Sequence, residues 1–131
     1  MKKDIHIPKV TDIEMAIALE YNEAHNVDEW IVYLINKKET PLEMVVIVSQ
    51  GFSETKTTSV FRKKIDLLPG QSSAKIELIQ PELFALDNRF QVTFFENNTL
   101  YDKTFLFKKD TIKENNLSNI KELNKQGIVC K

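Results

Sequence analysis

The stretch that decides the fold is FQVTFFENNTLYDKTFLF, which runs from Phe90 to Phe107. Both of its halves alternate apolar with polar residues, and this period of two is that of a β-strand with one buried face. Between them, Glu-Asn-Asn-Thr at positions 96–99 predicts a tight turn, because asparagine tolerates left-handed backbone geometry. The stretch therefore predicts an antiparallel hairpin. Its apolar face carries Phe90, Val92, Phe94, Tyr101, Phe105 and Phe107.

Further short strands are expected upstream of this hairpin. They span residues 29–36, 43–49, 57–67 and 74–78. The segment 29–36 is apolar on both faces, which suits a strand in the middle of a packed sheet. Leu68-Pro69-Gly70 predicts a type II turn, with proline before glycine. Residues 81–86 predict a single helical turn that begins at Pro81.

The segment 13–21 allows two interpretations. As a strand, it places Ile13, Met15, Ile17, Leu19 and Tyr21 on one face. As a helix, it begins with the capping box Thr11-x-x-Glu14 and presents a stripe of Ile13, Ala16, Ile17 and Ala24. We expect a strand, because the helical stripe is the weaker of the two patterns.

These segments predict a single all-β domain that covers residues 1–131. Residues 1–11 form a polar lead-in, 12–109 a sandwich and 110–131 a polar tail. About seven short strands without long helices between them favour an immunoglobulin-like antiparallel β-sandwich. A small β-barrel is the alternative. In the tail, the i, i+3, i+6 spacing of Leu117, Ile120 and Leu123 predicts a short amphipathic helix, with Ser118 as its cap and Gly127 at its end.

Composition excludes several classes of enzyme. The chain has 3 glycines, all isolated, so neither a dinucleotide-binding nor a P-loop phosphate cradle is present. One cysteine and 2 histidines cannot build a Cys/His zinc site, and no serine lies in G-x-S-x-G. We expect His6 and His25 to be surface residues. Most carboxylates are expected on solvent-facing positions or in turns; examples are Glu14, Glu20, Asp28, Glu29, Glu43, Asp66, Glu77 and Glu82. No catalytic, cofactor-binding or metal-binding residue is therefore predicted.

Charge and cysteine content indicate the setting in which the protein works. The net charge is −1, which makes nucleic acid an unlikely partner, and the lysine pairs are interpreted as protection of strand edges. The longest apolar run, Met44–Val48, is too short to span a bilayer. The N-terminus lacks the apolar region of a signal peptide, and Cys130 has no partner for an intrachain disulfide. We expect a cytoplasmic location.

A protein interface is the remaining expectation. Phe94 and Phe95 point to opposite faces of one strand, so one of them lies outside the main core. We expect the C-terminal helix or a second subunit to cover it. The candidate interface residues are Phe95, Phe105, Phe107, Leu117, Ile120 and Leu123. The partner is another protein, with a homodimer as one form.

Three stretches carry a family resemblance: VDEWIVY at 27–33, PLEMV at 41–45 and NNTLYDK at 97–103. With the opening residues 1–8, they resemble a small bacterial family of uncharacterised proteins, and the similarity covers nearly the whole chain. Some members carry the label phenylalanyl-tRNA synthetase alpha subunit. A class II synthetase core is much longer and has a G-x-G-x-x-R-type motif, which neither arginine of this chain joins. The resemblance therefore implies no activity and no site residues.

The sequence favours a non-enzymatic protein-interaction or structural module. This interpretation rests on the missing nucleophile, metal set and phosphate loop, in a fold that presents loops and edges to partners. An RNA-binding accessory factor is one alternative, which would need contiguous lysines and exposed aromatic side chains. An enzyme with dispersed carboxylate residues is the other, which would need a polar pocket with several convergent titratable groups.

Overall fold

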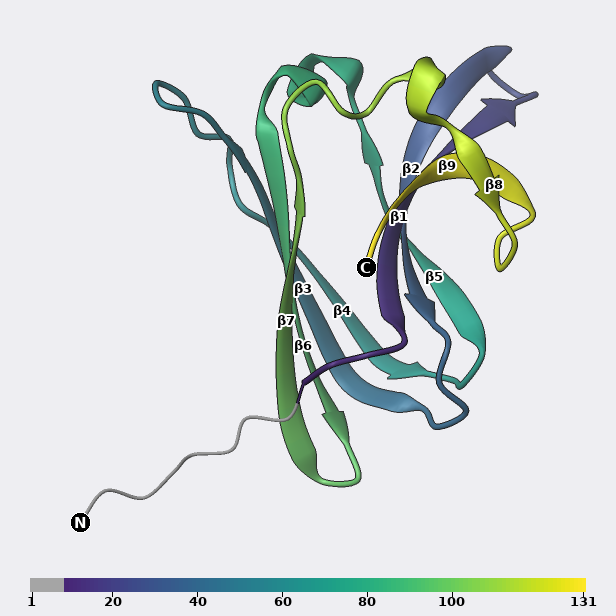
Figure 1. Cartoon of the computed structure of the whole chain (residues 1–131), viewed down its shortest axis with the longest axis vertical. Coiled ribbons are helices and arrows are strands. Elements are labelled where there is room, and N and C mark those ends of the chain that lie inside the picture. The colour runs from purple at the N-terminus through teal and green to yellow at the C-terminus, as the bar shows by residue number, and fades with distance from the viewer. Residues whose placement is uncertain (1–8) are drawn as a thin grey trace.

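Two antiparallel β-sheets face each other across one hydrophobic core in the computed structural model, which describes residues 9–131 (Figure 1). The five-stranded sheet has the order β5-β2-β1-β9-β8, and the four-stranded sheet has the order β4-β3-β6-β7. The strands are β1 (Ile13–Asn22), β2 (Val27–Asn36), β3 (Leu42–Phe52), β4 (Phe61–Leu68), β5 (Ser72–Ile79), β6 (Asp87–Glu96), β7 (Thr99–Phe107), β8 (Ser118–Ile120) and β9 (Lys125–Cys130). The 3-10 helices are η1 (Pro81–Ala85) and η2 (Glu114–Asn116).

The core lies between the inner faces of the two sheets. The four-stranded sheet contributes Phe90, Phe94 and Phe105, each fully buried. The facing sheet contributes the apolar side of β1 and β2. Phe107 packs edge-to-face on Phe90, with ring centroids 5.8 Å apart, which is a favoured geometry for aromatic pairs. Within residues 9–131 no helix is both long and apolar enough to cross a membrane.

All seven strands predicted upstream of the tail are found, although the fourth begins at Phe61 and not at residue 57. Residues 13–22 form β1, so the helical interpretation of this segment is wrong. The hairpin of β6 and β7 turns at Asn97 and Asn98, which both have positive φ angles, as a tight asparagine turn requires. The helical turn at Pro81 is confirmed as η1. The two sheets remain separate, so the alternative of a closed barrel is wrong.

The predicted C-terminal helix is wrong, because its residues form the hairpin of β8 and β9. The backbone N–H groups of Leu123 and Asn124 both donate to the Ile120 carbonyl oxygen, at 3.1 and 2.8 Å. The spacing of Ile120 and Leu123 is therefore that of one turn at the hairpin tip. No helix forms beyond this turn, because the backbone of β9 pairs with the open edge of β1, from Met15 to Leu19.

The same hairpin covers the outer face of the five-stranded sheet. Ala16 and Ala18 of β1 are fully buried on that face. Ile120 and Leu123 pack there in two small clusters, whose other members are Ala16, Ala18, Ile31, Tyr33, Ile35 and Val129. In Figure 1 the yellow hairpin lies against β1 on the side away from the four-stranded sheet. This cover explains why the segment 29–36 is apolar on both faces.

Two glycines allow close approach of neighbouring backbone. A Cβ atom on Gly127 would lie 2.7 Å from the Ile17 carbonyl oxygen and 3.0 Å from the Ala18 Cα atom. Gly127 thus lies inside β9 and does not end a helix. A Cβ atom on Gly70 would clash with the Glu39 carbonyl group. The predicted type II turn is wrong, because the positive φ angle (52°) belongs to Gln71 and not to Gly70.

We predict that Gly127→Ala lowers the free energy of unfolding by about 1–3 kcal/mol, because the added methyl group overpacks against the backbone of β1. Urea denaturation measures the loss. Gly51→Ala is the matched control within a strand, since its Cβ would meet only side-chain atoms, at 3.2–3.3 Å. Equal losses for the two variants would contradict the close approach of β9 to β1.

We also predict that Ile120→Ala costs about 2–5 kcal/mol of stability, as removal of a buried aliphatic side chain does. Ile120, the last residue of β8, is 2% exposed and packs on Ala16 and Ile35 of the sheet. Leu100→Ala is the control, because Leu100 is 58% exposed and its truncation is expected to change stability by less than about 0.5 kcal/mol. If both variants unfold at the wild-type urea concentration, the hairpin does not cover this face.

Candidate functional site

The six candidate interface residues lie in three different places. Phe105 and Phe107 are buried in the main core, so they contribute nothing to an outer surface. Phe95 lies half-buried on the outer face of the four-stranded sheet. The other three belong to the C-terminal segment: Leu117 precedes β8, while Ile120 and Leu123 cover the five-stranded sheet. The C-terminal segment therefore covers the opposite sheet from Phe95, contrary to the expectation.

The outer face of the four-stranded sheet is uncovered by the residues that the structure describes. Its register defines two neighbouring rows of side chains that cross the sheet from β4 to β7. The first row is Lys64, Val46, Thr93 and Asp102, and the second is Leu67, Glu43, Phe95 and Leu100. Leu67 is 52% exposed and Leu100 is 58% exposed. We call these two rows the outer patch.

A second feature is the carboxyl group of Glu77, which the sequence pattern places in solvent. The register between β2 and β5 pairs Val32 with Glu77 but Tyr33 with Lys75, so a bulge at Ile76 interrupts the alternation. The bulge turns Glu77 towards the interior and leaves Leu78 exposed. The Ser49 hydroxyl donates to Glu77 Oε2 at 2.8 Å and so links the two sheets. Burial raises the pKa of Glu77, and the Ser49 hydrogen bond partly opposes this shift.

Glu77 and Ser49 line a cavity of about 170 Å³ between the sheets. Its other walls come from β6, η1 and the start of β4, and include Asn88, Phe90 and Phe61. The Asn88 side-chain amide donates to the carbonyl oxygens of Leu83 and Leu86, at 2.9 and 3.1 Å, which fixes its orientation. The bulge that redirects Glu77 leaves no signal in the sequence, so sequence reasoning missed this cavity.

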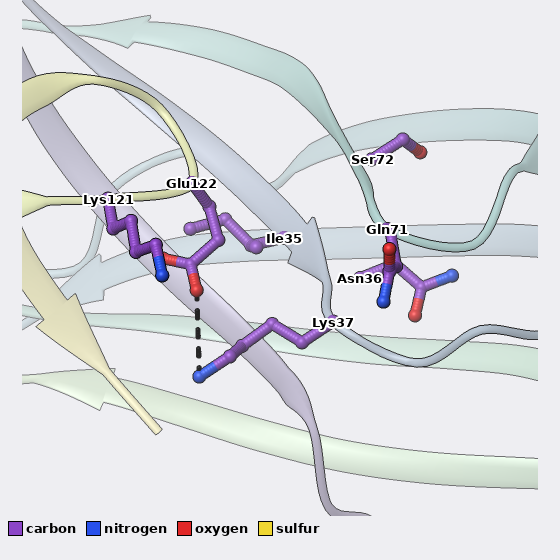
Figure 2. A pocket seen from close by; sticks show the side chains of 7 residues that line it. All are labelled: Ile35, Asn36, Lys37, Gln71, Ser72, Lys121 and Glu122. Carbon is purple, nitrogen blue, oxygen red and sulfur yellow. Dashed lines mark ion pairs between the residues drawn. The ribbon is translucent and has the colours of Figure 1, made fainter.

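A groove beside the C-terminal hairpin is shown in Figure 2. Lys37, at the end of β2, pairs with Glu122 of the hairpin tip at 3.7 Å and with Glu14 of β1 at 3.2 Å. The hydrogen bond to Glu14 raises the pKa of Lys37. Lys38 pairs with Glu96 at 3.1 Å. The Lys37–Glu122 pair ties the hairpin tip to the end of β2, and Lys37 and Lys38 are both engaged in ion pairs.

His25 and Cys130, the described histidine and cysteine, lie in different parts of the fold. His25 is exposed in the turn between β1 and β2, and His6 lies outside the described residues. The Cys130 thiol donates to the Leu106 carbonyl oxygen at 3.6 Å, beside the core. Within residues 9–131 no group of three or more His, Cys, Asp or Glu side chains is placed to hold a metal ion.

We predict that Glu77→Gln changes stability in a pH-dependent way. The raised pKa means that the folded state prefers the protonated carboxyl, so the wild type loses stability as the pH rises through that pKa. Glutamine does not ionise, and the variant is expected to gain stability relative to the wild type between pH 4 and pH 7. Urea unfolding at both pH values measures the difference, with the exposed Glu82→Gln as control. A difference that is the same at both pH values would contradict the burial of this carboxyl.

Two features of the described residues are thus suited to binding: the outer patch and the cavity at Glu77. The patch presents exposed leucines beside charges of both signs. The cavity presents a buried carboxyl beside aromatic side chains. No protein-family model, curated protein or solved structure matches this chain.

Proposed function

We propose that this chain is a non-enzymatic protein-interaction module that pairs with a second copy of itself through the outer patch. One observation carries the proposal: the C-terminal hairpin covers the outer face of the five-stranded sheet, whereas none of the residues 9–131 covers the equivalent face of the other sheet. Exposed leucines and a half-buried phenylalanine on an uncovered sheet face are features of a protein interface.

The outer patch is complementary to itself. Consider two copies whose four-stranded sheets face each other. A two-fold axis then runs parallel to the strands, midway between these two sheets, and passes between β3 and β6. Such an axis brings β4 of one copy opposite β7 of the other, as an isologous interface requires. Within the rows of the patch, Lys64 then faces Asp102 of the partner copy, and Leu67 faces Leu100. Opposite charges and exposed leucines both meet their counterparts.

We further propose an immunoglobulin-like Greek key for β1–β7. The arrangement β5-β2-β1 over β4-β3-β6-β7 supports it, because strands two and five pair in one sheet while three and six pair in the other. In this interpretation β8 and β9 are an extension of the sheet at β1. A cytoplasmic location is part of the proposal, supported by a lone cysteine that can form no disulfide within the chain.

A charge-reversal series tests the pairing. We expect Lys64→Glu to weaken dimerisation at least about tenfold, because it places two carboxylates opposite each other at two symmetric positions. Asp102→Lys should weaken it similarly. The double variant Lys64→Glu/Asp102→Lys should recover most of the affinity, since the opposite charges are restored. Sedimentation equilibrium of the purified chain measures each dissociation constant.

Lys75→Glu on β5 reverses a charge on the other sheet and serves as the matched control, with no expected effect on dimerisation. If the double variant does not recover the dimer affinity, the result contradicts the proposed two-fold arrangement. A wild-type chain that stays monomeric at millimolar concentration would overturn the proposal of self-association altogether.

A further inference from the structure

The cavity at Glu77 combines features that are independent of the outer patch. It lies between the two sheets and is lined from both of them, by Ser49 of β3, Glu77 of β5 and Asn88 of β6. Ser49 and Asn88 are buried and Glu77 is partly buried. Because polar groups are costly to bury unless they are paired, such a cluster is a specific arrangement rather than a by-product of packing.

The polar groups of the cavity are mainly acceptors. The Ser49 hydroxyl donates its hydrogen to Glu77 Oε2, and the Asn88 amide donates both of its hydrogens to backbone carbonyl oxygens. In the described part of the chain no donor reaches Glu77 Oε1 or Asn88 Oδ1, and because no fully buried side-chain oxygen there lacks a partner, both oxygens are accessible from the cavity opening. These two oxygens can therefore each accept a hydrogen bond from a ligand.

No cation of the described chain neutralises Glu77. Lys63 and Lys75 line a neighbouring hollow together with Glu77, yet across residues 9–131 neither lysine forms an ion pair with its carboxylate. A partly buried carboxylate without a counter-ion favours the entry of a cation, because the cation offsets the cost of desolvating the charge. Phe61 and Phe90 line the cavity at Glu77, and aromatic rings attract organic cations.

We propose that this cavity is a binding site for a small organic ammonium ion. The ammonium group donates hydrogen bonds to the Glu77 carboxylate and to Asn88 Oδ1, while a short alkyl chain contacts Phe61, Phe90 and Ile79. The volume of about 170 Å³ sets the size of the ligand, because cavities that hold drug-sized molecules are larger, at roughly 300–1,000 Å³. A ligand of a few non-hydrogen atoms fits, and we expect it to bind at millimolar concentration.

Titration of the ¹⁵N-labelled full chain with n-propylammonium chloride tests the proposal. The amide signals of Ser49, Gly51 and Glu77 report on the cavity. n-Propanol and sodium propionate have the same alkyl chain but are neutral or negative, and sodium chloride controls for ionic strength. We expect saturable shifts with propylammonium, at least tenfold weaker binding of propanol and no saturable shift with propionate. Equal binding of propylammonium and propanol by the wild-type chain would by itself overturn the proposal.

Glu77→Gln identifies the group that recognises the charge. We expect it to weaken propylammonium binding at least tenfold and to leave propanol binding unchanged. Glu82→Gln is the matched control, since Glu82 is exposed on η1 next to Leu83 of the cavity wall. Unchanged propylammonium binding by the Glu77→Gln variant would overturn the assignment. The outer patch is not part of the cavity, so dimerisation can succeed or fail in its own test regardless of this result.

Discussion

The five-stranded sheet has two apolar faces, and removing both from water is the constraint on which the rest of the architecture depends. The inner face is buried against the phenylalanines of β6 and β7. The outer face carries fully buried alanines, Ala16 and Ala18, beside larger apolar residues of β2. The small alanine side chains allow close approach, and β8 with the tip at Leu123 packs over them. Ion pairs at the rim, Lys37–Glu122 and Lys125–Glu20, hold this cover in place.

The two sheets consequently present different outer surfaces. One is covered by the C-terminal hairpin, whereas the described residues leave the other uncovered, with two rows of mixed charged and apolar side chains and exposed leucines. This asymmetry underlies the proposed self-association, since an uncovered face is the one free to meet a partner. The cavity at Glu77 arises from a different cause. It lies where a bulge in β5 turns a carboxyl inward between the sheets. Interaction and ligand binding are thus proposed for separate parts of the sandwich.

The scarcity of glycine also has a structural cause. Left-handed backbone positions in the hairpin turns are taken by asparagine, at Asn26, Asn97, Asn98 and Asn124, and no glycine has a positive φ angle. Asparagine can do this because its short polar side chain tolerates that geometry. Glycine remains where backbone approaches backbone, at Gly70 and Gly127. Three glycines are therefore enough for a sandwich with this many turns.

Local pattern determined the all-β class, the first seven strands and the turn at Asn97-Asn98, because alternation and turn chemistry act between neighbours in sequence. Tertiary contacts decided the rest. The spacing of Ile120 and Leu123 is compatible with a helix, and only the open edge of β1 makes β9 a strand. The pattern around Ile76 is regular, and only the bulge against β2 turns Glu77 inward. Alternation alone indicated that one of Phe94 and Phe95 lies outside the core. The rows of the outer patch and the cavity at Glu77 depend on partners distant in sequence, so local pattern did not define them.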